Sequence, residues 1–296
     1  MLSNLDAFSD EEALEIDRMV DELNDRTKNA SAYEDLIEFC KLMQSDYIVG
    51  KHHRILADML MAIERGEKDR ICVNIPPRHG KSQLVSIFYP AWFLGRNPNK
   101  KVMMVSHTTD LAVDFGRKVR NLIASDDYRA VFPTVKLAQD SKSAGRWNTN
   151  VGGEYYACGI DKAYEWFTFG ARTRLMPGGR VAIIQTRWHL DDLTGRVTRD
   201  MAQNDRSDQY EIIEFPAIIE AKNKKTKKVV EKPLWPEFFD LEALLRTKAS
   251  MPTFQWNSQY QQQPTAEEAA IVKREWWLEW TKEEPPTCEY VIMSLD

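Results

Sequence analysis

The sequence predicts an α/β fold in which a mostly parallel sheet has helices on both faces, preceded by an α-helical N-terminal segment. Two observations lead to this prediction. Short apolar runs alternate with longer amphipathic stretches from residue 70 onward, and each run has the length of a buried strand. No apolar run approaches the roughly 18 residues that cross a bilayer, so a membrane protein is not expected.

Composition and charge limit the possible classes of protein. Of the 296 residues, 43% are hydrophobic and 29% are charged, which is typical of a globular protein rather than a disordered one. Residues 1–50 hold 13 acidic and four basic residues, a net charge of −9, whereas the whole chain carries −5. The remainder therefore carries +4, which fits either local contact with nucleic acid or ordinary solvated helix faces.

The expected location is inside a cell. The acidic N-terminus has no apolar stretch of the kind that secretory signals contain. Four cysteines form no CxxC pair and indicate reduced thiols; they are Cys40, Cys72, Cys158 and Cys288.

Each secondary-structure element follows from a local pattern. Apolar residues at helical spacing predict helices within 9–45 and at 52–65. Apolar runs predict strands at 70–75, 101–106, 155–158, 180–185 and 210–215. Amphipathic stretches between them predict helices at 81–94, 109–124, 161–175 and 190–202. Pro90 is expected to kink or end the first of these helices.

Changes in composition predict the domain boundaries. Residues 1–50 form an acidic helical segment, and residues 51–257 form the α/β domain. A polar stretch predicts a linker over 258–289, and an apolar strand follows at 290–296. Five lysines within 222–228 predict an exposed loop or hairpin tip, which is either solvated or in contact with DNA phosphates.

The sharpest motif is the segment 75–82, IPPRHGKS, which lies between a predicted strand and a predicted helix. In a phosphate-binding loop, backbone N–H groups and the helix N-terminus hold the phosphates of a nucleotide. Lys81 would reach the β- and γ-phosphates, and the Ser82 hydroxyl would bind Mg²⁺. The first glycine of the usual pattern is replaced by Ile75, so an ordinary turn capped by Ser82 is the alternative.

The other loop residues have expected roles as well. The residues expected to bind ATP are Pro77, Arg78, His79, Gly80, Lys81 and Ser82. The Arg78 guanidinium is expected to stabilise charge on the γ-phosphate, and a surface arginine on a turn is the alternative. His79 is expected to be structural rather than catalytic.

Several segments beyond the loop point to one family: PPRHGKS, VMMVSHTTDLAVDFGRKVRNLI, ARTRLMPGGRVAIIQTRWHLDDLTGRV, LWPEFF and QWNSQYQQQPTAEEAAIVKREWW. In this order, over about residues 50–296, they resemble the large terminase subunit of tailed bacteriophages. The resemblance implies a P-loop NTPase fold of the ASCE type, with an ATPase domain that drives the packaging of viral DNA. It also implies a C-terminal RNase H-like nuclease domain that uses divalent metals.

The resemblance assigns roles to individual residues. The family's variant Walker A motif is matched by Arg78, Gly80, Lys81 and Ser82. Thr186, at the end of the predicted strand VAIIQ, matches the family's coupling motif, which links hydrolysis to movement. A hydroxyl at the carboxyl end of a central strand fits that role, since it would lie beside the γ-phosphate; capping of the next turn is the alternative. The implied catalytic residues are thus Arg78, Lys81 and Thr186. Asp296 matches the first metal-binding aspartate of the nuclease domain, whose site this chain alone is not expected to complete.

The chain departs from the family at the Walker B element, an apolar strand followed by two acidic residues that serve Mg²⁺ and the attacking water. The family carries it between the segments matching GGEYYACG and KAYEWF, which nearly touch here at 159–162. We therefore expect that a central strand is missing at 160/161, which leaves a hole in the sheet or forces strands to re-pair. Asp161 is either a substitute acid near the metal or a helix cap. The similar segment YEIIEF, with Glu214, follows Thr186 and has the wrong order.

The implied function is ATP-driven packaging of double-stranded viral DNA, with ATP and Mg²⁺, in the host cytoplasm and transiently at the procapsid portal. The implied partners are DNA, the portal protein, the small terminase subunit and further copies in a ring on the portal, without a membrane. Hydrolysis is expected to be impaired, so a remnant that only binds nucleotide or a partner is the alternative. Another P-loop ATPase, such as a helicase, explains the loop but not TRWHLDDLTGR or QYQQQP.

Three further groups of residues leave alternatives open. Tyr47 or His53 stacks on the adenine base, or His52 and His53 belong to a solvated helix start. The segment 189–192, HLDD, is either a metal cluster or a helix cap. The three tryptophans of 276–280 form either an interdomain cluster or a base-stacking surface.

Overall fold

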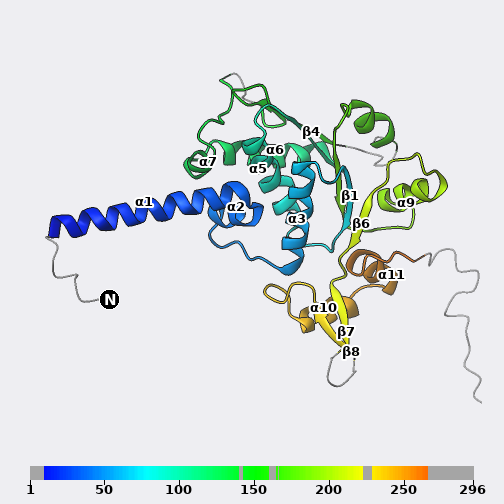
Figure 1. Cartoon of the computed structure of the whole chain (residues 1–296). Coiled ribbons are helices and arrows are strands. Elements are labelled where there is room, and N and C mark those ends of the chain that lie inside the picture. The colour runs from blue at the N-terminus through cyan, green and yellow to red at the C-terminus, as the bar shows by residue number, and fades with distance from the viewer. Residues whose placement is uncertain (1–9, 140–142, 160–164, 166, 223–228, 266–296) are drawn as a thin grey trace, which may run out of the picture. The chain divides into compact units, whose positions relative to one another are not determined.

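The computed structural model describes residues 10–139, 143–159, 165, 167–222 and 229–265 (Figure 1). The chain divides into the units 1–265 and 266–296, and every element below belongs to the first unit. Among the described helices, none has the length and apolar character needed to cross a membrane.

Three helices precede the first strand: α1 (Asp10–Glu34), α2 (Leu36–Met43) and α3 (Lys51–Arg65). Asp35 separates the first two, because its side chain accepts hydrogen bonds from the backbone N–H groups of Ile37 and Glu38 and so caps α2. Both α2 and α3 bury one apolar face in the main core. The helices predicted within 9–45 and at 52–65 are confirmed.

The first sheet contains β1 (Arg70–Asn74), β5 (Val181–Gln185) and β6 (Glu211–Glu214), all parallel, in the order β5-β1-β6. Val73 of β1 faces the core that includes α3. Cys72 faces the other way and packs with Val197 of α9 (Leu193–Gln203). Helices therefore cover both faces of this sheet, and Figure 1 shows α3 and α9 on opposite sides of β1.

The second sheet contains β2 (Lys101–Ser106), β4 (Glu154–Gly159) and β3 (Arg146–Asn148), in the order β2-β4-β3. The pair β2 and β4 is parallel, and β3 joins β4 antiparallel. Helix α6 (Thr109–Ile123) packs on one face, where Val119 and Tyr155 belong to the main core. On the other face Tyr156 is 38% exposed, and Met103 and Val105 are half-buried and belong to none of the described core clusters.

The predicted strands and their parallel pairing are confirmed, but the prediction of a single sheet with helices on both faces is not. Strand β5 is one of the two outer strands of the first sheet and β2 one of the two outer strands of the second, and among the described residues each pairs with one neighbour only. Strands of parallel sheets are usually buried on both faces. All six residues of β2 are at least partly exposed, whereas four of the five residues of β1 are buried.

The chain after β1 forms one helical run. It consists of α4 (Lys81–Gln83), the π-helical turn η2 (Leu84–Phe88) and α5 (Tyr89–Arg96). Pro90 lies in the first turn of α5, directly after the π turn. Since proline has no N–H to donate to the preceding turn, the regular helix is interrupted here, as the sequence predicted.

The remaining elements extend or correct the predictions. They are α7 (Asp126–Val131), η3 (Phe167–Ala171), η4 (Arg172–Arg174), β7 (Ile218–Lys222), β8 (Val229–Pro233), α10 (Leu241–Ala249), α11 (Thr253–Gln255) and η5 (Trp256–Tyr260). Within the helix predicted at 161–175, Glu165 is α-helical, and the turns that follow are the π-helix η3 and the 3-10 helix η4, so the described part is helical but not a regular α-helix throughout. The 160/161 junction lies outside the described residues. The predicted linker begins within η5, where Ser258 is buried, so its first residues pack with the domain.

Candidate functional site

The loop between β1 and α4 has an unusual backbone. Arg78 has a φ of 59° and Gly80 a φ of 76°, both in the left-handed region. Glycine adopts this conformation without cost, whereas a residue with a Cβ atom is strained there. Space also requires glycine at position 80, because an added Cβ would lie 2.1 Å from Nε2 of His53.

Two histidines of α3 form hydrogen bonds to the backbone of this loop. Nε2 of His52 and Nε2 of His53 lie 3.2 and 3.1 Å from the backbone oxygen of His79. Nδ1 of His53 accepts a hydrogen bond from the backbone N–H of Gly50 at 3.0 Å, so its Nε2 carries the proton and donates. Nδ1 of His79 in turn donates to the backbone oxygen of Pro77 at 2.8 Å. Hydrogen bonds from two α3 side chains and one within the loop therefore fix its backbone.

The three histidines are buried and neutral. His52 is 1% exposed, and His53 and His79 are 0% exposed, next to Trp235 and Phe239. Burial lowers the pKa of each histidine from 6.5 to about 4. The expectation that His52 and His53 are solvated is therefore wrong. The ring of His53 is enclosed and bonded at both nitrogens, so it is not free to stack on a base.

Lys81 is a half-buried cation at the start of the helical run. Its Nζ donates to the backbone oxygen of Pro76 at 3.2 Å, and burial lowers its pKa to about 8. No carboxylate within the described part of the chain forms an ion pair with it. Arg78 and Ser82, on either side, are exposed. The loop therefore offers positive charge and an accessible hydroxyl to an anion.

Thr186 lies at the base of the loop. Asn74 of β1 pairs with Gln185 of β5, so the strand ends are adjacent. The Thr186 hydroxyl donates to the backbone oxygen of Ile75 at 2.8 Å, and the residue is 8% exposed. The structure thus brings Thr186, predicted from the sequence as a separate motif, into contact with the first residue of the loop.

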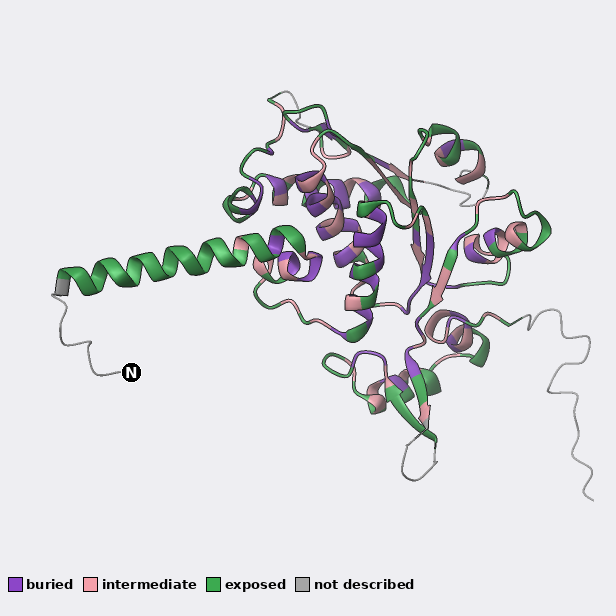
Figure 2. Cartoon of the chain, in the orientation of Figure 1, coloured by how far each residue is buried: buried purple, intermediate pink, exposed green. Residues whose placement is uncertain are grey.

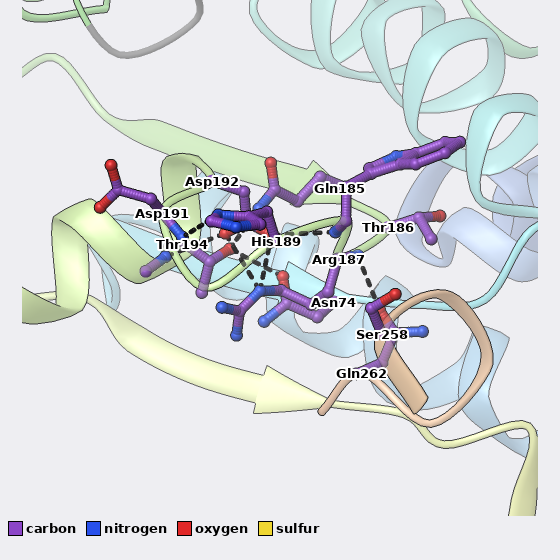
Figure 3. Close-up of polar contacts among 12 residues, drawn as sticks. Asn74, Gln185, Thr186, Arg187, His189, Asp191, Asp192, Thr194, Ser258 and Gln262 are labelled. Atoms are coloured by element: carbon purple, nitrogen blue, oxygen red, sulfur yellow. Dashed lines mark hydrogen bonds and ion pairs between the residues drawn. The ribbon is translucent and has the colours of Figure 1, made fainter. Parts of the chain in front are cut away.

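An ion pair lies beyond Thr186 (Figure 3). Nε of Arg187 donates to both carboxylate oxygens of Asp192 at 3.1 and 2.8 Å, and these side chains are 9% and 11% exposed. Another nitrogen of Arg187 donates to Glu214 of β6 at 3.4 Å. The backbone N–H of Arg187 donates to the Gln262 side chain at 3.1 Å. One residue therefore links the end of β5 to β6 and to the segment after η5.

A second set of polar contacts joins the same strand ends. The Thr194 hydroxyl donates to Asn74 at 2.8 Å and accepts from Gln185 at 2.6 Å. Asn74 donates to Glu214 at 3.4 Å. Neither Asn74 nor Arg187 was predicted from the sequence as a site residue, and the same holds for Gln262. The available signal was a polar residue directly after an apolar strand, which in a parallel sheet lies at the ligand-binding edge.

The segment 189–192 is a helix cap rather than a metal cluster. Asp192 caps α9 by accepting from the backbone N–H of Gly195 at 3.0 Å. Asp191 pairs with Arg196 and Arg199. No group of three or more metal-ligating side chains suited to a metal ion occurs in the part of the chain that the structure describes.

Four predicted features fall on residues that the structure does not describe. These are Asp161, Asp296, the tryptophans of 276–280, and residues 223–228 of the lysine run. The strands β7 and β8 on either side of residues 223–228 pair antiparallel.

Comparisons with known proteins find a distant likeness in fold. No family model matches the sequence, and no curated protein matches it significantly. Among solved structures, the fold is similar to an arginine-to-alanine mutant of the large terminase ATPase domain of Thermus phage P74-26. The identity is 13%, the match covers 70% of this chain and 93% of that chain, and the TM-score is 0.48. This likeness is too distant to assign a family or a function.

Proposed function

We propose that the loop at 75–82 binds the phosphates of ATP, and that Lys81 provides the main cationic contact. The observation that carries this proposal is the state of Lys81, a half-buried ammonium without a carboxylate partner among the described residues. A nucleotide phosphate would supply the missing negative charge. The N–H groups of a left-handed loop at the start of a helical run would contribute further donors.

The backbone strain at Arg78 supports the same proposal. A non-glycine residue with a φ of 59° persists only where its surroundings enforce it, and such residues cluster at functional sites. The side chain of Arg78 is exposed. We propose that its guanidinium stabilises charge on the γ-phosphate.

The loop residues also suit Mg²⁺ that arrives with the nucleotide. The exposed Ser82 hydroxyl follows Lys81 directly, and Mg²⁺ commonly binds through one or two protein oxygens together with phosphate oxygens and waters. When bound, the ion would neutralise charge on the β- and γ-phosphates. Ser82 would orient it at the start of the helical run.

We propose that Thr186 couples the loop to the rest of the domain. Its hydroxyl holds the backbone oxygen of Ile75, and the next residue, Arg187, is bonded to Asp192 and to Gln262. A change in the loop on loss of the γ-phosphate would move the end of β5. That movement would reach α9 and the segment after η5 through these bonds.

At the level of the whole protein, we propose a DNA-packaging motor of the large-terminase type. The support is the ordered set of segments from PPRHGKS to QYQQQP, which resembles that family over most of the chain. Double-stranded DNA, the portal protein, the small terminase subunit and a ring of further copies are the proposed partners. The net charge of +4 outside residues 1–50 is compatible with DNA contact.

A second candidate function is nucleotide binding without hydrolysis. The observation that favours it is the pair of outer strands β5 and β2, each with a single neighbour among the described residues. If a central strand that carries the Walker B acids were missing, both β5 and β2 would lack their second neighbour. The chain would then keep the phosphate loop and lack the acids that activate water.

The test is ATP binding and Mg²⁺-dependent hydrolysis by the whole chain beside Lys81→Ala. Loss of one charge-assisted contact should weaken binding about 10–100-fold. Lys101→Ala is the matched control, because this lysine at the start of β2 has a side chain that is 73% exposed. Equal binding by Lys81→Ala and the parent chain would overturn the proposal. Binding with turnover supports the motor, and binding without turnover supports the second candidate.

The pH dependence of binding gives an independent readout of Lys81. Its pKa of about 8 in the free protein would rise when phosphates bind, so binding takes up a proton above pH 8. Affinity should therefore fall by up to about tenfold per pH unit above pH 8. A flat profile between pH 7 and 9 would argue against contact between Lys81 and the phosphates.

A further inference from the structure

Helix α1 carries an exposed apolar stripe that the proposed function does not use. Residues 11–28 are all exposed, which is most of the helix Asp10–Glu34 (Figure 2). Large apolar side chains within this part are strongly exposed: Ile16 is 41% exposed, Met19 59%, Val20 49% and Leu23 64%. Exposed apolar side chains that form one continuous patch mark an interaction surface.

The spacing places these four residues on one face. They follow the pattern i, i+3, i+4, i+7, and a helix turns by about 100° per residue, so they lie within about 100° of one another. Leu14, which is 75% exposed, lies about 180° from Leu23 and is not part of the stripe. The same helix therefore contains an apolar docking face and an isolated apolar residue on the opposite side.

The exposed part of α1 lacks the packing that normally stabilises a helix. Isolated helices shorter than about 12–15 residues are marginal in water, and most helical stability in proteins comes from burying an apolar face. Within residues 11–34 only Ala32 is buried, and its backbone oxygen accepts from Trp92 at 3.0 Å. A partner that covers the stripe would supply the missing burial.

The charge of α1 determines the kind of partner. The helix holds nine acidic and three basic residues. Glu15 and Glu22 flank the stripe on one side and Asp17 flanks it on the other, by the same helical spacing. Arg26 is already paired with Glu22 at 2.8 Å. An acidic surface of this kind repels DNA and anionic membranes.

The same charge disfavours the chain's own segments and a second copy. Residues 266–296 hold eight acidic and three basic residues, so this segment is acidic as well. Two α1 helices side by side would bring the two acidic borders together, and like charges across a helix pair are destabilising. A complementary partner therefore has to be basic.

We propose that α1 docks, through Ile16, Met19, Val20 and Leu23, onto an amphipathic helix of another protein whose apolar stripe is bordered by lysine and arginine. The apolar side chains interlock as in a two-stranded coiled coil, and the acidic borders of α1 select the partner by charge. This surface is separate from the phosphate loop, and its use does not depend on nucleotide binding.

The experiment uses the whole chain and a synthetic helical probe. The probe is a three-heptad peptide with leucine at positions a and d and lysine at positions e and g; the matched probe has glutamate at e and g. The lysine probe should bind, and its affinity should fall as salt rises. The variant Met19→Ala/Leu23→Ala, which keeps high helix propensity, should weaken binding about tenfold or more. Leu14→Ala is the control and should bind like the parent chain.

Three results would overturn the proposal. One is equal binding of the lysine and glutamate probes, which would mean that the borders do not select charge. Another is failure of the lysine probe to bind a chain whose helix content is intact by circular dichroism. The third is a dimer in sedimentation that Met19→Ala/Leu23→Ala dissolves, which would assign the stripe to a second copy.

Discussion

The two sheets of this domain differ in how completely they are covered. In β5-β1-β6, side chains on both faces belong to core clusters, and α9 covers the face opposite α3. In the sheet β2-β4-β3, α6 covers one face. On the other face Tyr156 is exposed, and Met103 and Val105 of β2 are partly exposed. The candidate site lies entirely on the first sheet.

This difference indicates where the domain can hold a precise geometry. The loop, Thr186 and Arg187 are bonded to strands that are covered on both sides, so their positions are determined by close packing. The second sheet has fewer constraints, and the edge of β2 that pairs with no described strand is of the kind that other chains can pair with. Four experiments test this contrast, from the largest expected effect to the smallest.

The largest effect is expected at the ion pair of the first sheet. Asp192→Asn keeps the shape of the side chain but leaves Arg187, whose side chain is 9% exposed, without the carboxylate that accepts from its Nε. Breaking a buried pair of this kind should lower the free energy of unfolding by about 3–5 kcal/mol. Urea denaturation measures this loss of stability.

Asp191→Asn is the matched control. Its urea midpoint should hardly change, because Asp191 is an exposed partner of Arg196. Equal effects would mean that Arg187 finds another partner.

The same core truncation should have different effects in the two sheets. Val73 of β1 is 0% exposed, whereas Val105 lies on the face of β2 that packs into no described core cluster and is half-buried. Val73→Ala should lower the free energy of unfolding by about 2–3 kcal/mol, and Val105→Ala by less than about 1 kcal/mol. Thermal and urea unfolding of the two variants provide the comparison. A large effect of Val105→Ala would show that the outer face of β2 is covered in solution.

Two buried threonines are expected to depart from the contrast between the sheets, because the one near the second sheet makes more hydrogen bonds. Thr186 makes one hydrogen bond, to Ile75, whereas Thr149 near β3 donates to Pro98 at 2.7 Å and accepts from Gly153 at 2.8 Å. Thr186→Val should cost about 1 kcal/mol and Thr149→Val about 2 kcal/mol, because the second leaves two buried backbone groups unpaired. Here the second sheet is the more sensitive one. The reverse order in unfolding experiments would mean that water replaces the Thr149 hydroxyl at both backbone groups.

The effect that is smallest at neutral pH is the titration of the buried histidines. An unfolded histidine titrates near 6.5 and buried His52 near 4, so the unfolded chain binds more protons between these values. Stability is therefore present above pH 6.5 and is lost as the pH falls toward 4, by up to about 1.4 kcal/mol per pH unit for each such histidine. His52→Gln keeps a donor at Nε2 and should reduce this slope between pH 6.5 and 5. The exposed His107→Gln is the control, and equal slopes would show that His52 is not buried in solution.

Much of the fold could be predicted because the relevant signals are local. Hydrophobic periodicity gave β1, β2, β5 and α6 nearly at their observed bounds. The loop at 75–82 was recognisable because a phosphate loop depends on a few consecutive residues between a strand and a helix. Thr186 could be placed at the carboxyl end of its strand by the same local pattern.

The remaining features depend on contacts that are distant in the sequence. Whether β2 joins β5 in one sheet is decided by pairing across the chain, which no local pattern reports. Two adjacent histidines at a helix start look solvated, and only the packing of Trp235 and the loop against them shows that they are buried. The bond between Arg187 and Gln262 joins residues 75 positions apart.

The left-handed glycine of the loop affects how tolerance to mutation should be interpreted. Any side chain at position 80 would meet the ring of His53, whether or not a nucleotide is bound. A saturation mutagenesis screen scored by protein abundance alone would therefore reject almost every codon at position 80. At position 81 the same screen would accept many codons, since Lys81 makes a single backbone contact. Two neighbouring positions of one motif would thus be retained in evolution for different reasons, Gly80 for folding and Lys81 for the ligand.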